Sequence, residues 1–341
     1  MTKQFPKVFI IVLNWNKLQN ILECLKSVFL QDYPNYEVVV VDNASTDGSC
    51  DVIEREYPTV CLIKNSTNLG YAGGNNVGIR YAMSKNPDYI WLLNNDLTVE
   101  RKCLREIIGA AEKSDSIGLV SPIVYHYDRP NQSQFAGSYM NWEDLSLVYL
   151  DWDSEVGEKY EIPSDLCLWG TALLIKRKLI EKIGYLKDEY FAYWEDIEYS
   201  LRSIKAGFEN VVCKSGKVFH RNEFEEGNGF KKEKYFYYFM QRNRIILANE
   251  YFEKVIPRLK FKIRYFAELS DYVRRYGNGN IDAVMDGAWH GIKGITGPMR
   301  SEDKMPSYIK KLLVLMSRLH PVFFADLITF RFEKISRKIG V

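Results

Sequence analysis

Apolar and polar positions follow a regular alternation over the first hundred residues of the chain. Short uninterrupted apolar runs, rich in β-branched residues, are typical of strands buried on both faces of a sheet. Four such runs occur, at Val8–Leu13, Tyr36–Val41, Val60–Ile63 and Tyr89–Leu93. Between them, apolar residues recur at helical spacing. The alternation predicts an α/β fold with a mostly parallel central sheet flanked by helices.

The pattern loosens after residue 100. Leu104–Glu112, Lys178–Ile183 and Ile197–Ala206 have helical spacing, and a helix is also expected after Gly74. Shorter apolar runs predict strands at Gly118–Pro122, Leu168–Ile175, Val211–Val212 and Lys217–His220, and residues 125–165 favour antiparallel strands and loops. Beyond Arg221, long helical patterns dominate. We therefore predict two parts, an α/β domain over 1–225 and a helical extension over 226–341.

Polar residues follow each of the first four predicted strands. They are Asn14 and Asn16, then Asp42 and Asn43, then Asn68, Gly73, Gly74 and Asn75, and finally Asn94, Asn95 and Asp96. Open α/β sheets bind ligands at the carboxyl ends of their strands. A nucleotide would use a carboxylate for its base, amides for its ribose, and glycines for backbone approach to its phosphates. Each loop alone could hold ordinary turn and cap residues, but their repetition favours a ligand site.

Composition narrows the function further. The net charge of +2 gives no overall basic field, so nucleic acid is not an expected partner. Six scattered cysteines without a C-x-x-C pair are typical of reduced thiols in a cytosolic protein. The start of the chain does not resemble a signal peptide, and no apolar run has the length of a membrane span. We expect a cytoplasmic protein that is neither a dehydrogenase nor a P-loop enzyme, because both glycine fingerprints are missing.

Several segments together resemble the family-2 inverting glycosyltransferases, nearest to their bacterial rhamnosyltransferase and galactofuranosyltransferase-like branch. The resemblance covers roughly residues 7–245 and rests on Val8–Asn16, Val38–Ser49, Asn68–Asn76, Leu92–Asp96, Trp169–Ala172, Trp194–Glu198 and Phe219–His220. It implies the GT-A fold of nucleotide-diphospho-sugar transferases, a nucleoside diphosphate sugar donor, and a divalent cation, Mg²⁺ or Mn²⁺.

The resemblance also implies roles for the metal and ribose ligands. The family's D-x-D motif reads Asn94-Asn95-Asp96 here, so an amide replaces the first acid and can still bond a ribose hydroxyl. Asp96 is then the charged metal ligand, and His220 is a second ligand or a diphosphate contact. The alternatives are a helix N-cap for Asp96 and a structural histidine for His220.

Glu195 and Asp196 are the candidate catalytic pair. Inversion at a sugar carbon needs one carboxylate to accept the proton of the attacking hydroxyl. By family pattern Asp196 is this general base, and Glu195 binds the acceptor or supports the base. The pair precedes an amphipathic helix, whose amide donors would stabilise a carboxylate. The alternative is an ordinary acidic helix start, a role that Glu198 fits better.

Three further residues have implied roles that an ordinary structural interpretation explains equally well. By resemblance, Trp169 belongs to a loop beneath the acceptor, and Trp194 lines the acceptor cleft. Both could equally be aromatic residues of the core. Arg242, followed by Asn243, resembles a pair near the donor phosphates, although an exposed helical arginine would look the same.

Residues 310–338 combine apolar side chains with many lysines and arginines. A basic amphipathic helix can lie on an anionic membrane, which suits a peripheral protein on the inner face of the cell membrane and a lipid-linked acceptor. A helix that packs on the catalytic domain, or one that forms a homodimer, explains the pattern equally well.

The function predicted from these features is transfer of a sugar to a hydroxyl of a cell-surface glycan or a lipid-linked saccharide. The nearest motif set suggests L-rhamnose from dTDP-L-rhamnose. A UDP-hexose or UDP-galactofuranose transferase remains an alternative, as does a non-catalytic sugar-nucleotide or glycan-binding subunit. A nucleotidyltransferase is disfavoured, because Asn14-Trp15-Asn16-Lys17 replaces the glycine-rich basic loop that would hold a triphosphate.

Overall fold

The computed structural model describes residues 5–150, 164–221, 224–225, 229–230, 233–252, 260–269 and 280–316. The chain divides into two compact units, which are described separately below. The first comprises Met1–Met140 and Leu147–Lys231, and the second comprises Asn141–Ser146 and Lys232–Val341. The predicted boundary near residue 225 lies close to Lys231, but the prediction did not place Asn141–Ser146 with the C-terminal part.

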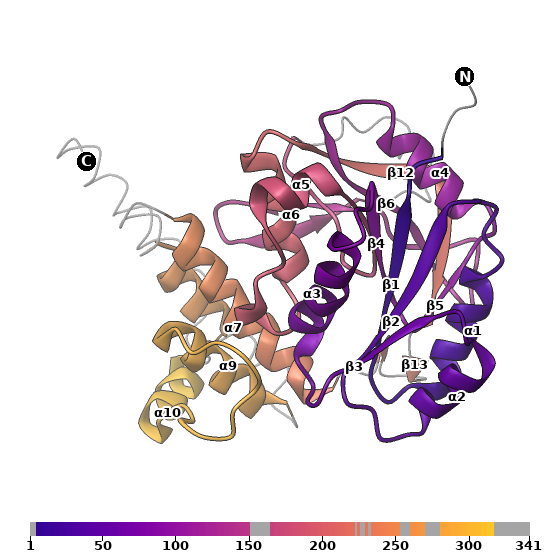
Figure 1. Ribbon diagram of the computed structural model, residues 1–341. Coiled ribbons are helices and arrows are strands. Elements are labelled where there is room, and N and C mark those ends of the chain that lie inside the picture. Colours follow the sequence, from indigo (N-terminus) through magenta and orange to yellow (C-terminus); the bar gives the residue numbers. More distant parts are fainter. Residues whose placement is uncertain are drawn as a thin grey trace. The chain divides into compact units, whose positions relative to one another are not determined.

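A nine-stranded sheet forms the centre of the first unit (Figure 1). Its order is β3-β2-β1-β4-β11-β6-β12-β5, with β7 paired to β6. The four strands predicted in the first hundred residues are β1 (Val8–Asn14), β2 (Tyr36–Asp42), β3 (Cys61–Lys64) and β4 (Tyr89–Asn94), all parallel. The later strands are β5 (Leu97–Val99), β6 (Ile117–His126), β7 (Ser133–Phe135), β11 (Ala172–Lys176) and β12 (Glu209–His220). The predicted α/β class and its flanking helices are confirmed.

Helices cover both faces of this sheet (Figure 1). On one face, α1 (Leu18–Val28), α2 (Ser49–Glu56) and α4 (Cys103–Ala111) share a hydrophobic core with one set of sheet residues, such as Ile10 of β1. On the other, α3 (Gly70–Met83), α5 (Arg177–Ile183) and α6 (Glu195–Lys205) share a second core with the alternate sheet residues, such as Ile11 of β1. Burial on both faces explains why these strands are continuously apolar.

Four elements were predicted in the correct region but with the wrong bounds. The strand expected at Gly118–Pro122 is the longer β6. The strand expected at Leu168–Ile175 begins only at Ala172, as β11, and a separate short strand, β10 (Leu166–Cys167), precedes it. The two strands expected after residue 210 are one, β12, whose pairing with β6 shifts between Cys213 and Lys217. Helix α3 begins at Gly70, four residues before Gly74. In each case pairing or packing with distant residues sets the boundary, which local pattern cannot show.

A small antiparallel sheet accounts for part of the predicted irregular region. Its order is β10-β8-β9, with β8 at Ser138–Asn141 and β9 at Ser146–Tyr149. The antiparallel pairing of β6 with β7 and of β8 with β10 matches the expectation for this part of the chain. Residues 151–163 lie outside the described residues. A short hairpin, β13 (Phe224–Glu225) with β14 (Gly229–Phe230), follows β12.

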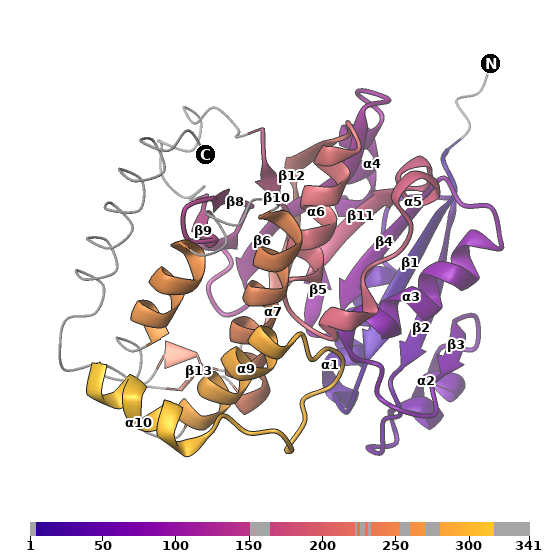
Figure 2. The same cartoon turned by 90° about the vertical axis from the view of Figure 1, so that its left-hand side faces the viewer.

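From residue 233 onward, the described parts of the second unit are mainly helical, and the predicted C-terminal helices are confirmed. It contains α7 (Lys234–Tyr251), a helical segment at 260–269, α9 (Ile281–Lys293) and α10 (Ser307–Met316). Helices α7 and α9 lie side by side in both views (Figures 1 and 2). Gly287 of α9 permits this approach, since a Cβ there would lie 2.3 Å from the carbonyl oxygen of Tyr238. The Tyr238 hydroxyl also contacts His290 Nδ1 at 2.6 Å.

The predicted basic amphipathic segment at 310–338 is described only as far as Met316. Across the ranges that the structure describes, no helix combines the length and the apolar character needed to cross a membrane.

Candidate active site

Asn14 ties together the carboxyl ends of β1, β2 and β4. Its side chain is fully buried, and its Nδ2 donates hydrogen bonds to Asp42 Oδ1 and Ser49 Oγ, each at 2.9 Å. Its Oδ1 accepts a hydrogen bond of 2.8 Å from Asn95 Nδ2. The strand register, which places Asn14 opposite Asp42, makes this possible. The side-chain amide of Asn14 therefore joins three predicted site residues at the ends of three strands.

Asp42 and Asn43 organise the loops after β2 and β3. Both are almost completely buried. Asp42 Oδ2 accepts a hydrogen bond of 2.8 Å from the Ser45 backbone N–H. Asn43 Nδ2 donates to the Gly70 carbonyl oxygen at 2.9 Å, and its Oδ1 accepts from Asn65 Nδ2 at 2.9 Å. These hydrogen bonds therefore hold the loops after β2 and β3 in place at the sheet edge where we predicted nucleotide binding.

Asn16 is the exposed member of this group. Its φ of 50° lies in the left-handed region, which asparagine adopts more readily than most residues. Its Oδ1 accepts a hydrogen bond of 2.7 Å from the Thr46 N–H, so it links the loop after β1 to the loop after β2.

The segment Asn68–Asn76 begins α3 instead of forming an open loop. Asn68 Oδ1 accepts a hydrogen bond of 2.8 Å from the Gly70 N–H at the start of the helix. Gly73 and Gly74 are buried, and a Cβ on Gly74 would lie 2.5 Å from Leu13 Cδ1. The glycine at 74 is required for close packing of α3 on β1. Asn75 is buried, and within the described chain its Oδ1 has no hydrogen-bond partner.

Asp96 and His220 meet at the other side of β4. The pairing of β12 with β5 brings them together, and His220 Nε2 lies 3.2 Å from Asp96 Oδ1. That oxygen is buried and has no hydrogen-bond partner among the described residues. On the far side of the ring, His220 Nδ1 contacts Gln134 Oε1 at 2.9 Å. The two predicted metal ligands are therefore adjacent.

The spacing of the pair fits a divalent cation. Neighbouring ligands of an octahedral Mg²⁺ or Mn²⁺ ion, each bound at about 2.1 Å, are separated by about 3 Å. The 3.2 Å between Asp96 Oδ1 and His220 Nε2 agrees with this spacing. No group of three or more His, Cys, Asp or Glu side chains suited to a metal occurs in the described ranges. Substrate phosphates and water would complete the shell, as is common for Mg²⁺.

Asp196 lies at the start of α6 and contacts the chain between β10 and β11. Its Oδ2 accepts a hydrogen bond of 2.8 Å from the Gly170 N–H, and its Oδ1 accepts one of 2.8 Å from the Ile197 N–H. Burial raises the pKa of this carboxyl group above its ordinary value, although the backbone hydrogen bonds oppose the rise. An aspartate with a raised pKa is a stronger base when ionised.

Glu195 has a different environment. It is 3% exposed, and its Oε2 has no hydrogen-bond partner in the described part of the chain. Burial raises the pKa of Glu195 well above its ordinary value, and the charge of Asp196 raises it further. Asp196 accepts backbone N–H donors from Gly170 and Ile197, which oppose the effect of burial on the pKa of its carboxyl group. The two adjacent carboxyl groups therefore have different environments.

The segment before this pair has an unusual backbone. Phe191, Tyr193 and Trp194 have φ values of 63°, 65° and 74°. Bulky residues rarely adopt positive φ, at a cost of about 1–3 kcal/mol each, and such strain clusters at functional sites. The carbonyl oxygen of Phe191 accepts a hydrogen bond of 3.2 Å from the Ala72 N–H at the start of α3.

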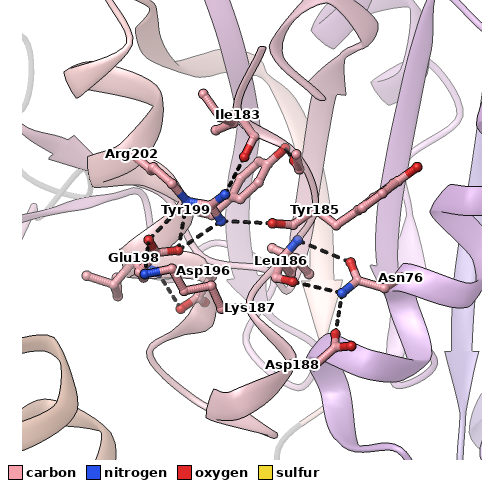
Figure 3. A network of polar contacts seen from close by, with 12 residues as sticks. Asn76, Ile183, Tyr185, Leu186, Lys187, Asp188, Asp196, Glu198, Tyr199 and Arg202 are labelled. Atoms are coloured by element: carbon pink, nitrogen blue, oxygen red, sulfur yellow. Dashed lines mark hydrogen bonds and ion pairs between the residues drawn. The ribbon is translucent and has the colours of Figure 1, made fainter. Parts of the chain in front are cut away.

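A polar network connects α6 to the loop that follows α5 (Figure 3). Arg202 binds both carboxylate oxygens of the buried Glu198 and donates to the carbonyl oxygens of Ile183 and Tyr185. Lys187 forms a second ion pair with Glu198 at 3.2 Å. Glu198 thus has the structural role that its position suggested.

Asn76 of α3 holds the other end of the same loop (Figure 3). Its side chain donates to the Leu186 carbonyl oxygen at 2.8 Å and accepts from the Leu186 N–H at 3.1 Å. It also donates to Asp188 Oδ1. Helices α3 and α6 therefore fix the loop that leads to Glu195 and Asp196.

Aromatic side chains gather near Gly170, whose N–H binds Asp196. Trp169 is partly exposed and stacks on Phe135, with ring centroids 3.7 Å apart. Tyr149 meets Trp169 edge-on, and burial together with the charge of Asp196 raises the pKa of its hydroxyl. The Tyr71 hydroxyl donates to the Gly170 carbonyl oxygen. Tyr71, Tyr149 and Gln134 were not predicted from the sequence, and of these only Tyr71 lies inside a matched motif.

Arg242 and Asn243 belong to the second unit. Both are fully buried on α7, and Arg242 Nε donates to Asn243 Oδ1 at 2.8 Å. The guanidinium group also donates to the Gly297 carbonyl oxygen and lies 4.7 Å from the Phe239 ring centroid. Arg242 is therefore not an exposed helical arginine, and its contact with donor phosphates stays a prediction.

The sheet order and the polar groups at its edge define a nucleotide-sugar transferase of the GT-A fold. A model of glycosyl transferase family 2 matches residues 9–184, which is more than half of the chain. The protein belongs to glycosyl transferase family 2 and is a glycosyltransferase of the EC 2.4 class that uses a nucleotide-sugar donor.

Curated relatives come from archaea and bacteria. The Haloferax volcanii low-salt glycan biosynthesis hexosyltransferase Agl10 is 25% identical over 84% of this chain and 92% of its own. Glycosyltransferase AglE of the same organism is 39% identical over 67% and 74%. The Mycobacterium tuberculosis N-acetylglucosaminyl-diphospho-decaprenol L-rhamnosyltransferase is 25% identical over 60% and 72%.

Solved structures agree on the fold. The mannosyltransferase PcManGT from Pyrobaculum calidifontis, in complex with GDP-Man and Mn²⁺, has a TM-score of 0.54 at 17% identity, over 98% of this chain and 89% of its own. GalNAc-T7 with UDP, GalNAc and Mn²⁺ has a TM-score of 0.60 at 12% identity, over 86% and 58%.

Proposed function

We propose that this glycosyltransferase inverts the configuration of the sugar it transfers, with Asp196 as the general base. The observation that carries the proposal is the pair Glu195 and Asp196, in which Asp196 accepts two backbone hydrogen bonds and the buried Oε2 of Glu195 has no hydrogen-bond partner among the described residues. Asp196 is held by the Gly170 N–H, and the next residue, Thr171, accepts a hydrogen bond of 3.1 Å from the Asn94 N–H. The base is thereby tied to the strand end that carries Asp96.

The reaction needs few groups from the protein. Asp196 accepts the proton of the acceptor hydroxyl as its oxygen attacks the anomeric carbon from the side opposite the nucleoside diphosphate. Protonated Glu195 bonds the acceptor, and Asn94 bonds a ribose hydroxyl. Asp96 and His220 would hold Mg²⁺ or Mn²⁺, which when bound stabilises the negative charge of the leaving diphosphate.

The proposed donor is dTDP-L-rhamnose and the proposed acceptor a cell-surface glycan or lipid-linked saccharide. The similarity to an L-rhamnosyltransferase that acts on a decaprenol-linked sugar supports both. The hexosyltransferase Agl10 and a galactofuranosyltransferase of Mycolicibacterium smegmatis are similarly distant relatives, which keeps UDP-hexoses and UDP-galactofuranose in the donor panel.

Asp196→Asn tests the base assignment. We expect this variant to bind the donor normally, because the carboxamide is nearly the same size, and to lose about 10²–10⁴-fold in the rate of transfer, the usual contribution of a general base. Asp115→Asn is the matched control, since Asp115 is 90% exposed. Isothermal titration and a transfer assay measure the two quantities. Full transfer activity in Asp196→Asn would remove Asp196 from this role.

We further propose that 310–338 binds an anionic membrane surface. In the described part of this segment, Leu312 and Leu315 are more than half exposed, as is Tyr308 just before it. Their i, i+4, i+7 spacing puts all three on one face of α10.

Co-sedimentation with vesicles of mixed neutral and anionic lipid tests this binding. The double change Leu312→Ser with Leu315→Ser should release the protein from the vesicles, whereas Leu30→Ser, at an equally exposed site in the first unit, should not. Unchanged vesicle binding would contradict the proposal. Unchanged binding together with a shift from dimer to monomer in light scattering would identify the face as a homodimer contact.

A further inference from the structure

Gln134 and His220 lie on the two strands that flank β6. Gln134 is on β7, His220 is at the end of β12, and both strands pair with β6 near Val124. The position of β7 is well fixed, because Phe135 is buried and stacks on Trp169 at a centroid distance of 3.7 Å. The resulting contact between Gln134 Oε1 and His220 Nδ1 is 2.9 Å long.

The chemistry of this contact determines where the imidazole proton lies. A carboxamide oxygen only accepts hydrogen bonds, so the proton of a neutral His220 must be on Nδ1. The lone pair of Nε2 is then directed at Asp96 Oδ1, 3.2 Å away. Asp96 Oδ1 itself is buried and lacks a hydrogen-bond partner in the described ranges. Two electron-rich atoms face each other, which is the arrangement that a cation between them would stabilise.

We infer that Gln134 is a positioning residue for the cation site: it fixes the tautomer and ring orientation of His220 so that Nε2 and Asp96 Oδ1 bind one divalent cation together. This inference rests on the proposed metal pair. The alternative is a purely structural role. In that case the positions of the Gln134 amide oxygen and nitrogen are exchanged, and His220 Nε2–H donates a hydrogen bond to Asp96.

Binding of Mn²⁺ alone to the metal-free protein, followed by electron paramagnetic resonance, separates the two roles. Mutation of a residue that forms a hydrogen bond with a metal-bound histidine typically lowers metal affinity 10–100-fold. We expect Gln134→Leu to raise the Kd for Mn²⁺ by this factor and His220→Ala to raise it at least as much. Gln134→Glu keeps an acceptor for Nδ1–H and should restore most of the affinity. Gln132→Leu, two residues away at an exposed position, is the matched control and should not change the Kd.

Nitrogen NMR of the imidazole provides a readout that needs no metal. In the metal-free wild-type protein, the signals of His220 should show a proton on Nδ1, and Gln134→Leu should shift the tautomer equilibrium. A proton found on Nε2 in the wild-type protein would overturn the inference.

The Mn²⁺ titration also separates a failure of Gln134 from a failure of the metal pair. If His220→Ala weakens binding and Gln134→Leu does not, the role of Gln134 is overturned and the metal pair stands. If His220→Ala leaves the Kd unchanged, the metal pair itself is overturned, and the role of Gln134 with it. Thermal unfolding of each variant verifies that it is folded.

Discussion

Two adjacent carboxyl groups at the start of α6 have opposite surroundings. Asp196 accepts two backbone hydrogen bonds, whereas Glu195 is buried with one oxygen that has no partner among the described residues. A buried carboxylate without partners is costly, so burial and the charge of Asp196 raise the pKa of Glu195 well above its ordinary value. Two side chains of the same chemistry can therefore act separately as hydrogen-bond donor and base.

Glu195→Gln should stabilise the protein in a pH-dependent way. Because the folded-state pKa of Glu195 is raised, its stability contribution is complete below the ordinary glutamate pKa and is lost as pH rises toward the raised value. The carboxamide that replaces it does not titrate, so the melting temperature of the variant should match that of the wild type near pH 4. At pH 8 it should exceed it by a few degrees. A difference that is constant with pH would contradict the protonation assignment.

Residue-level prediction from sequence succeeded where a motif supplied the residue. The polar residues at the ends of β1, β2 and β4 were expected to meet, and Asn14, Asp42 and Asn95 do. Gln134, Tyr71 and Tyr149 could not be predicted in this way. Gln134 reaches His220 across 86 residues of sequence, and only the pairing of β7 with β6 creates that contact.

Helix α3 supports the segment that leads to the candidate base. At its N-terminus, Gly70 has a φ of 75° and lies against Phe191, whose carbonyl oxygen would be 2.3 Å from a Cβ at this position. The glycine-rich start of α3 suggested an open loop, because glycine is a poor helix former. Packing on the sheet outweighs that preference, since Gly74 and Gly78 let the helix approach Leu13 and Ile11.

Gly70→Ala should lower the free energy of unfolding more than Gly48→Ala does. Both glycines have positive φ, at 75° and 79°, so both changes incur a similar backbone cost of about 1–2 kcal/mol. A Cβ at Gly48 would meet nothing within 4 Å, whereas one at Gly70 would collide with the Phe191 backbone. We expect an additional loss of about 1–3 kcal/mol at Gly70. Urea unfolding measures both, and equal losses would show that α3 does not constrain the segment.

At the scale of the whole molecule, the hydrophobic pattern was sufficient to predict the part of the sheet whose strands alternate with helices along the chain. The order β3-β2-β1-β4 follows from strand–helix repeats, which the first hundred residues display. The insertion of β11 between β4 and β6, and the shifted pairing of β12, depend on contacts between distant segments. Strand β11 follows Gly170, whose N–H binds Asp196, and β12 ends at His220. The candidate base and the candidate metal ligand His220 were consequently predicted from motif resemblance and not from the hydrophobic pattern.

Release of nucleoside diphosphate from a panel of sugar donors tests the central claim most directly. The purified protein would be incubated with dTDP-L-rhamnose, UDP-hexoses and UDP-galactofuranose, with Mn²⁺ or with EDTA, beside Asp196→Asn and Asp115→Asn. We predict release from one donor, dTDP-L-rhamnose, that EDTA abolishes and that Asp196→Asn reduces at least about 100-fold while Asp115→Asn does not. Release that persists in EDTA and in Asp196→Asn would contradict the account.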